Sequence, residues 1–201
     1  MPLISLKNTF DEDGLIFTKV ENLFFHPQGG GQPNDKLLDK DANPVMIKKM
    51  GGDIYLGINP SSIQDGKIEI FVDQQFNRLC SRLHSAGHLI ALVTEREFST
   101  IPVKAHHFPN EAYIKFEGIL DKELLSDMSK KLSAECDKNL AVKITHDEKG
   151  RLVTFEGLGG YHCGGTHVKC LSEIGDIELT SISNKKGATT IKYTLLDLDK
   201  S

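Results

Sequence analysis

Two pairs of potential metal ligands constrain the fold of this chain most strongly. His84 and His88 stand four residues apart in RLHSAGHLIALV, and Cys163 and His167 stand four apart in YHCGGTHVKC. Four residues along an α-helix advance by about 400°, so the two histidines project from one face, one turn apart. The glycines between Cys163 and His167 suit a tight turn in which these two side chains converge. Together the pairs make a complete set of four ligands for one zinc ion.

The two pairs leave other interpretations open. A helical histidine pair can simply border a core, and the apolar arc of Leu79, Leu83 and Ile90 runs beside this one. Zinc with four protein ligands is typical of a closed structural site, whereas catalytic zinc usually keeps one position open for water or substrate. The same four residues are therefore compatible with a structural brace and with a catalytic centre.

The composition predicts a compact, soluble protein. The 201 residues, 39% of them hydrophobic, suffice for one large domain or two small ones. The net charge of -4 means that a nucleic acid would have to be attracted by a local basic patch. Since neither a signal-peptide pattern nor an apolar run of roughly 20 residues is present, we expect a cytoplasmic protein with no membrane contact. We accordingly expect Cys80, Cys136 and Cys170 to be reduced thiols.

The hydrophobic pattern divides the chain near residue 73. Residues 1–72 contain short strand-like segments, among them 15–26, 44–50 and 53–58, separated by turn residues, which predicts a small antiparallel β-barrel-like domain. From Asp73, which can cap a helix, apolar residues recur at intervals of three and four, so a helix is expected to carry the histidine pair. A second helix with Asp121 as its cap is predicted, and the remaining segments, the last of them residues 189–199, read as antiparallel strands. The fold class is therefore α+β, with two long helices on the sheet of residues 73–201.

Three segments carry a family resemblance. The segments HSAGHL, CGGTHV followed by EIGDIEL, and PQGGGQPND resemble the free-standing alanyl-tRNA editing proteins of the AlaX type over nearly the whole chain. These proteins are similar to the editing domain of alanyl-tRNA synthetase. The PQGGGQPND segment is similar to the longer members, which add a small N-terminal domain. The resemblance implies that residues 73–201 form a zinc-binding aminoacyl-tRNA editing domain.

The activity that the resemblance implies is hydrolysis of mischarged tRNA(Ala), releasing serine or glycine. The zinc ligands and catalytic centre carry over onto His84, His88, Cys163 and His167. No obligate protein partner is implied. Activated esters of this kind need a placed water and relief of charge on the carbonyl oxygen, and bound zinc can provide either. The alternative is a non-catalytic, zinc-containing module that binds tRNA without hydrolysing it.

Further residues are candidates for substrate contacts. The glycines Gly29, Gly30 and Gly31 can approach a ligand closely, and we expect their amides and the Gln32 side chain to bind the tRNA end, although a simple hairpin connection is the alternative. Polar groups near the zinc that could prefer a serine hydroxyl are Gln32, Ser85 and Thr166. Because His106 and His107 follow a strand, alternation predicts that only one faces inward.

Two departures from the usual family pattern bear on these contacts. Ser85 and Gly87 lie between the histidines, where threonines are frequent, and Thr189 and Thr190 lie where an arginine often appears. Lys185 and Lys186 are candidates for contacts with the tRNA backbone. An exposed basic turn without such contacts is the alternative for the two lysines.

Overall fold

The computed structural model of the chain describes residues 2–121 and 123–196, which divide into two compact units. Residues 2–28 and 33–77 form the first unit, and the second contains residues from 78 onward. The second unit also includes the segment Gly29–Gln32, although its neighbours in the sequence on both sides belong to the first. The glycine-rich segment is therefore part of the unit that carries the two ligand pairs.

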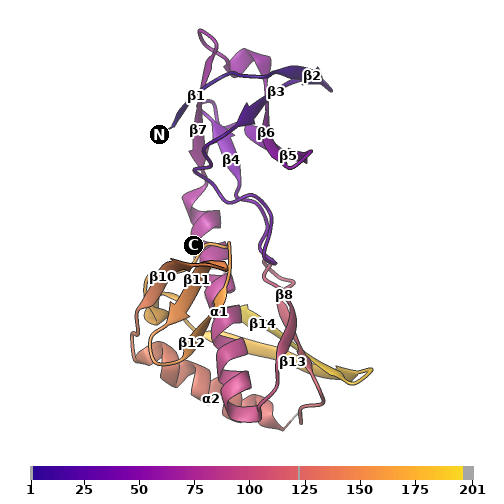
Figure 1. Cartoon of the computed structure of the whole chain (residues 1–201), viewed down its shortest axis with the longest axis vertical. Coiled ribbons are helices and arrows are strands. Elements are labelled where there is room, and N and C mark those ends of the chain that lie inside the picture. Colours follow the sequence, from indigo (N-terminus) through magenta and orange to yellow (C-terminus); the bar gives the residue numbers. More distant parts are fainter. Residues whose placement is uncertain (1, 122, 197–201) are drawn as a thin grey trace. The chain divides into compact units, whose positions relative to one another are not determined.

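The first unit is a seven-stranded antiparallel sheet in the order β1-β7-β4-β5-β6-β3-β2 (Figure 1). Its elements are β1 (Leu3–Ser5), β2 (Phe10–Glu12), β3 (Leu15–Val20), β4 (Leu37–Asp39), β5 (Pro44–Met50), β6 (Asp53–Ile58), the 3₁₀ helix η1 (Pro60–Ser62) and β7 (Lys67–Val72). Its core is formed by Phe25, Leu37, Val45, Leu56, Ile58, Ile68 and Ile70. Within the described residues no pairing joins β1 to β2, so the barrel-like closure stays a prediction.

Short turns set the register of this sheet. Asp13-Gly14 joins β2 to β3 and Gly51-Gly52 joins β5 to β6, and all four residues have positive φ. Two consecutive positive φ values define the two-residue turn whose twist matches that of antiparallel strands. The predicted strands over residues 44–50 and 53–58 are confirmed with their boundaries. The strand predicted from Leu15 ends earlier, at Val20.

The second unit has a four-stranded antiparallel sheet in the order β13-β14-β9-β8 and a three-stranded sheet in the order β10-β11-β12. Its elements are α1 (Gln74–Phe98), which begins in the first unit, β8 (Pro102–His106), β9 (Tyr113–Glu117), α2 (Leu124–Asp137), β10 (Val142–Asp147), β11 (Gly150–Phe155), β12 (Gly159–His162), the 3₁₀ helix η2 (Leu171–Glu173), β13 (Ile177–Lys185) and β14 (Ala188–Leu195). Helices and antiparallel sheets confirm the α+β class. The last predicted strand runs on to residue 199, and residues 197–199 lie outside the described part of the chain.

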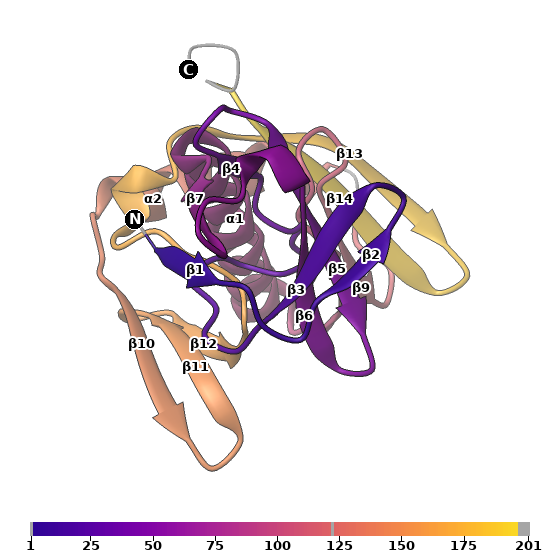
Figure 2. The same ribbon diagram turned by 90° about the horizontal axis from the view of Figure 1, so that it is seen from above.

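Helix α1 passes between the two sheets of the second unit (Figures 1 and 2). Asp73 caps its start, because the backbone N–H of Phe76 donates to Asp73 Oδ1 at 3.0 Å. Every residue from Leu83 to Thr94 is buried, and the surrounding core includes Ile114 and Phe116 of β9 and Phe155 of β11. A helix buried on all sides holds its polar side chains in the interior, and this helix carries His84 and His88.

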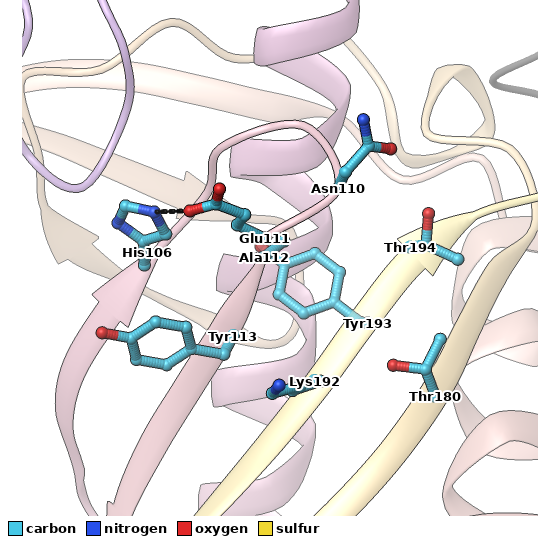
Figure 3. Close-up of a pocket in the computed structure, with 9 residues that line it drawn as sticks. All are labelled: His106, Asn110, Glu111, Ala112, Tyr113, Thr180, Lys192, Tyr193 and Thr194. Carbon is cyan, nitrogen blue, oxygen red and sulfur yellow. Dashed lines mark ion pairs between the residues drawn. The ribbon is translucent and has the colours of Figure 1, made fainter.

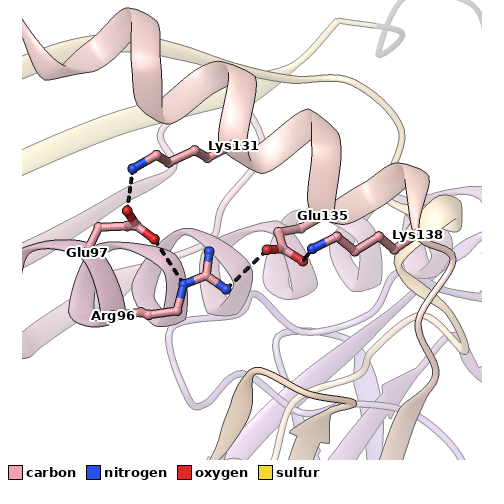
Figure 4. Close-up of polar contacts among 5 residues, drawn as sticks. All are labelled: Arg96, Glu97, Lys131, Glu135 and Lys138. Atoms are coloured by element: carbon pink, nitrogen blue, oxygen red, sulfur yellow. Dashed lines mark hydrogen bonds and ion pairs between the residues drawn. The ribbon is translucent and has the colours of Figure 1, made fainter.

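Ion pairs join the last turn of α1 to α2 (Figure 4). Arg96 contacts Glu135 at 3.1 Å, Lys138 contacts Glu135 at 2.8 Å, and Glu97 contacts both Arg96 and Lys131. Burial alone would raise the pKa of Glu135, but the hydrogen bonds from Lys138 and Arg96 bring it below its ordinary value. These contacts fix one side of α2, while Met128 and Leu132 fill the core on the other.

The predicted cap of the second helix is wrong. The capping position is Glu123, which makes no side-chain capping bond, and Asp121 instead accepts a hydrogen bond from the Glu123 backbone at 3.0 Å. The carboxylate therefore closes a turn that precedes the helix.

None of the four cysteines is in a disulfide. Among the described residues, no helix combines the length and apolarity that crossing a membrane requires.

Candidate metal centre

The side chains of His84, His88, Cys163 and His167 converge in the second unit. One ligand atom from each residue lies within 4.8 Å of the others, so the four residues form a group that could hold a metal ion. Cys163 Sγ is 3.1 Å from His84 Nε2, and the His84 and His88 rings are 5.0 Å apart between centroids. Ligand atoms around tetrahedral zinc, with bonds of about 2.0–2.3 Å, would be about 3.3–3.8 Å apart. The group is therefore close to the dimensions of a zinc site.

Gln32 fixes the protonation of His84. The backbone N–H of Thr166 can only donate, and it donates to Gln32 Oε1 at 2.9 Å, which identifies that atom as the amide oxygen. The same oxygen lies 2.7 Å from His84 Nδ1. Since an amide oxygen can only accept, His84 Nδ1 carries the proton, and Nε2 keeps its lone pair toward Cys163. A fixed tautomer of this kind is the usual arrangement of metal-binding histidines.

The CGGTH turn is held by Arg151 of β11. Arg151 Nη1 donates to the carbonyl oxygens of Cys163 and Gly165 at 2.6 and 2.8 Å. Gly165 packs directly on the His84 ring, because a Cβ at this position would lie 2.0 Å from His84 Cε1 and 2.8 Å from Gln32 Oε1. A Cβ at Gly164 would meet nothing within 4 Å. Of the two glycines, only the second is required by a close approach.

Two hydroxyl groups of α1 contact the same turn. Ser85 Oγ lies 3.1 Å from His167 Nδ1 and accepts a hydrogen bond from the Val168 backbone at 3.1 Å. Ser81 donates to Thr166 Oγ1 at 2.7 Å, and the Gln32 amide donates to the same oxygen at 2.8 Å. Gln32, Ser85 and Thr166 thus hydrogen-bond to the metal group or to one another, and their contact with a substrate stays a prediction.

The protonation states of the group suit a cation. Burial, and to a smaller degree the charge of Arg151, lowers the pKa of His88 from 6.5 to about 4, so this ring is neutral at neutral pH. Its buried Nδ1 has no hydrogen-bond partner among the described residues. Burial raises the pKa of the Cys163 thiol, although the N–H of Gly165 and the charge of Arg151 act in the opposite direction. Three imidazoles and one thiol that a metal would deprotonate fit zinc.

The glycine-rich segment forms a tight turn next to the group. Gly29 and Gln32 exchange backbone hydrogen bonds at 3.0 and 3.1 Å, while Gly30 and Gly31 between them have positive φ. A Cβ at Gly30 would lie 3.8 Å from His84 and 3.9 Å from Cys163. The turn therefore brings backbone close to the metal group and positions Gln32.

A pocket of about 240 Å³ adjoins the metal group. Its lining combines two metal-group residues with apolar and aromatic side chains, namely Gly30, Gly87, His88, Ala91, Pro102, Ala105, His107, Ile114, Tyr161, His162, Cys163 and Gly164. His162 at its edge is paired with Asp147 at 2.9 Å. Its size fits a small group such as a short amino acid.

His107 is a buried member of this pocket. It is 2% exposed, and its ring stacks on that of His84 with centroids 4.4 Å apart. Its Nδ1 lies 2.6 Å from the hydroxyl of Tyr193, and burial lowers its pKa from 6.5 to about 3. Strand alternation indicated that one of His106 and His107 faces inward. No sequence signal identified Arg151 or Tyr193, because their contacts form only when separate elements pack together.

His106 faces a second pocket, of about 590 Å³, on the four-stranded sheet (Figure 3). There it pairs with Glu111 at 3.7 Å and stacks on Phe108. No member of the metal group lines this pocket. Lys185 and Lys186 are exposed at the turn between β13 and β14, and their role in tRNA binding stays a prediction.

Sequence comparisons show which proteins the whole chain is similar to. No protein-family model matches the chain. It is 27% identical to the alanyl-tRNA editing protein AlaX-M of Methanosarcina barkeri, over 90% of this chain and 89% of that protein. It is 25% identical to AlaX-M of Saccharolobus solfataricus, over 88% of this chain and 87% of that protein. Alanine--tRNA ligase of Clostridioides difficile is also 25% identical over 88% of this chain, which spans 24% of the ligase.

Fold and site together define an α+β protein with a partly buried His/Cys group that could hold a metal ion. The similarities extend over about nine-tenths of the chain. They confirm the resemblance that the HSAGHL and CGGTHV segments indicate. The chain is thus similar to alanyl-tRNA editing proteins of the AlaX type.

Proposed function

We propose that the chain is a hydrolase that edits mischarged tRNA(Ala) in trans, with serine or glycine as the amino acid removed. The observation that carries the proposal is the convergence of His84, His88, Cys163 and His167 in a chain similar to AlaX-M proteins along most of its length. The reaction adds water across the ester and releases the free amino acid and the tRNA. We assign the reaction to residues 73–201 together with the Gly29–Gln32 turn. Residues 1–72 are proposed to form a separate barrel-like domain.

The four ligands are proposed to hold zinc. When bound, zinc would polarise the ester carbonyl, activate a water or orient the free amino group of the substrate. Gln32 supports this role by keeping the proton of His84 on Nδ1, so that Nε2 presents its lone pair. Three neutral imidazoles and one thiolate would leave a net charge of about +1, which suits an ester better than a phosphoryl group.

The protein supplies a small pocket and nearby backbone amides for the substrate. The pocket of about 240 Å³ beside His88 and Cys163 would take the aminoacyl group. The amides of Gly29, Gly30 and Gly31 are proposed to bind the terminal ribose or phosphate, and Lys185 and Lys186 the tRNA backbone. A cytoplasmic location and the lack of an obligate protein partner stay predictions.

Deacylation assays test the proposal. Zinc-loaded protein is incubated with seryl-, glycyl- and alanyl-tRNA(Ala), and the released amino acid is measured. We expect Cys163→Ala to lower release from seryl-tRNA(Ala) by at least about a hundredfold, because one ligand is lost. Cys170→Ala is the matched control, since this partly buried cysteine lies outside the metal group. Unchanged turnover in Cys163→Ala would exclude the proposed centre.

A second candidate function is a zinc-containing module that binds tRNA without hydrolysing it. It is favoured by the number of ligands, because four protein side chains can fill every position of tetrahedral zinc. Filter binding of seryl-tRNA(Ala) separates the two functions. Retention of intact seryl-tRNA(Ala) without release of serine would favour the binding module.

A further inference from the structure

A buried series of hydrogen bonds from His107 through Tyr193 to Leu83 lies beside the metal group and is not used by the function proposed above. His107 Nδ1 is 2.6 Å from the Tyr193 hydroxyl, which is 3.0 Å from the carbonyl oxygen of Leu83. His107 and Tyr193 are 2% and 3% exposed. The backbone N–H of His107 also donates to Gly31 at 2.7 Å, so the residue is held at both its backbone and its ring.

The protons in these two hydrogen bonds can be assigned by elimination. The Leu83 carbonyl can only accept, and Tyr193 has a single proton, which it donates to that carbonyl. The Tyr193 oxygen must then accept from His107, so His107 Nδ1 carries a proton. Because a neutral imidazole has one N–H, His107 Nε2 keeps a lone pair and is a hydrogen-bond acceptor.

Neighbouring groups occupy the other atoms of the His107 ring. Nδ1 and Cε1 of the His107 ring pack against Gly87, and Cδ2 packs against Gly31. Within the described residues, the hydrogen bond of the His107 ring is the one from Nδ1 to Tyr193, and the ring face stacks on His84. His107 lines the pocket that His88 and Cys163 also line, so Nε2 is the ring atom left for a bound molecule.

Gly87 makes room for the ring. A Cβ at this position would lie 2.3 Å from His107 Cε1 and 2.7 Å from the Tyr193 hydroxyl. The imidazole of His107 fills the space that a side chain at position 87 would need, and it brings a polar atom to the pocket.

We propose that His107 is a specificity-determining residue whose Nε2 accepts a hydrogen bond from the hydroxyl of a seryl group, with Tyr193 as the residue that positions it. The inference rests on the proposed function, because it places the aminoacyl group in this pocket. A seryl group satisfies the buried acceptor, whereas an alanyl or glycyl group leaves it unpaired. The pocket thereby prefers serine over alanine, which differs from it by this hydroxyl alone.

Binding of stable analogues tests the inference without turnover. The probes are amide-linked seryl and alanyl derivatives of 3′-amino-3′-deoxyadenosine, titrated calorimetrically into zinc-loaded protein. We expect wild type to prefer the seryl probe by about tenfold, and H107A to lose this preference, since one neutral hydrogen bond is removed. H106A is the matched control, because His106 faces the other pocket and should leave the preference unchanged.

Tyr193→Phe tests positioning while preserving the ring that fills the core. Without the hydroxyl, the proton of His107 is no longer confined to Nδ1, so we expect the preference to fall about threefold. Long-range ¹H–¹⁵N spectra report the tautomer directly, and wild type should show protonated Nδ1 even if H107A does not fold. A proton on Nε2 in wild type would overturn the inference.

Two further binding results would overturn the inference. Equal weakening of both probes in H107A would indicate a purely structural role and overturn the inference, as would a wild type without hydroxyl preference. Deacylation of seryl- and glycyl-tRNA(Ala) is measured in parallel. A wild type that prefers the seryl probe through His107 but releases no amino acid would contradict the proposed function and leave the inference standing.

Discussion

The two halves of the metal group supply two side chains each, but different contacts hold them. His84 and His88 are 0% and 8% exposed on a helix that fixes their spacing through its own backbone. Cys163 and His167 are half-buried in a turn that belongs to no helix or strand. The α1 half is therefore defined locally, whereas the turn half needs support from elsewhere in the chain.

That support comes from three other segments of the chain. Arg151 holds two carbonyls of the turn, Gln32 accepts from the Thr166 backbone, and Ser81 bonds to the Thr166 hydroxyl. A spacing of four residues therefore has a different physical meaning in each pair. In a helix it is sufficient to align two ligands, and in a glycine-rich turn it only permits alignment.

The largest loss of zinc affinity is expected from Gly165→Ala, which separates the two halves. The added Cβ would lie 2.0 Å from the His84 ring, so the turn must move away from α1 and the four ligands can no longer meet. We expect zinc affinity to fall by more than about a hundredfold, measured by competition with a chromogenic chelator. Gly164→Ala, one residue away in open space, is the control and should bind zinc as wild type does. Equal affinities for both variants would show that the close packing is unimportant.

The α1 half is the part that the sequence predicts best. A period of three and four with Asp73 at its start is enough to locate the helix and align His84 with His88. Strands β5 and β6 are predicted equally well from the sequence, because each shows alternation and the Gly51-Gly52 turn separates them. These features depend on residues that are neighbours in the sequence.

The remainder depends on contacts that no local pattern records. Arg151 lies in an ordinary alternating strand, and its bonds to the CGGTH turn exist only once β11 and the turn are packed. The pairing of His107 with Tyr193 joins residues 86 apart. Strands of three or four residues such as β1, β2 and β12 are too short for alternation to identify.

Acid should affect the α1 half first. The pKa of His88 is about 4 in the fold because of burial, against 6.5 ordinarily, so the unfolded chain binds the proton more readily between these values. Stability of the metal-free protein should therefore fall as the pH is lowered from 6.5 to about 4, by about 3 kcal/mol from this residue. Urea titrations at several pH values measure it. His88→Gln, which cannot be protonated, should lessen this dependence and leave the part due to buried His107, and an unaltered slope would contradict the assignment.

Gln32→Ala tests the residue that contacts both halves. Without the amide, His84 Nδ1 and the Thr166 N–H lose their common acceptor, so both the tautomer and the turn are less well fixed. Loss of such a partner typically costs about 10–100-fold in metal affinity. Gln28→Ala is the control, because this exposed glutamine belongs to the first unit. A loss confined to the turn half would leave the His84 tautomer unchanged in long-range ¹H–¹⁵N spectra.

The smallest effect is expected from Arg151→Met, which acts on the turn alone. The methionine keeps much of the apolar stem but removes two hydrogen bonds to the carbonyls of Cys163 and Gly165, so the turn becomes less ordered while α1 is untouched. We expect zinc affinity to fall by about tenfold, equivalent to one or two net hydrogen bonds. Lys149→Met, in the exposed turn of the same hairpin, controls for the lost charge. Hydrogen exchange should increase in residues 163–167 and stay constant in α1. Faster exchange in α1 as well would mean that the two halves are ordered together, and the distinction between a local half and a supported half would fail.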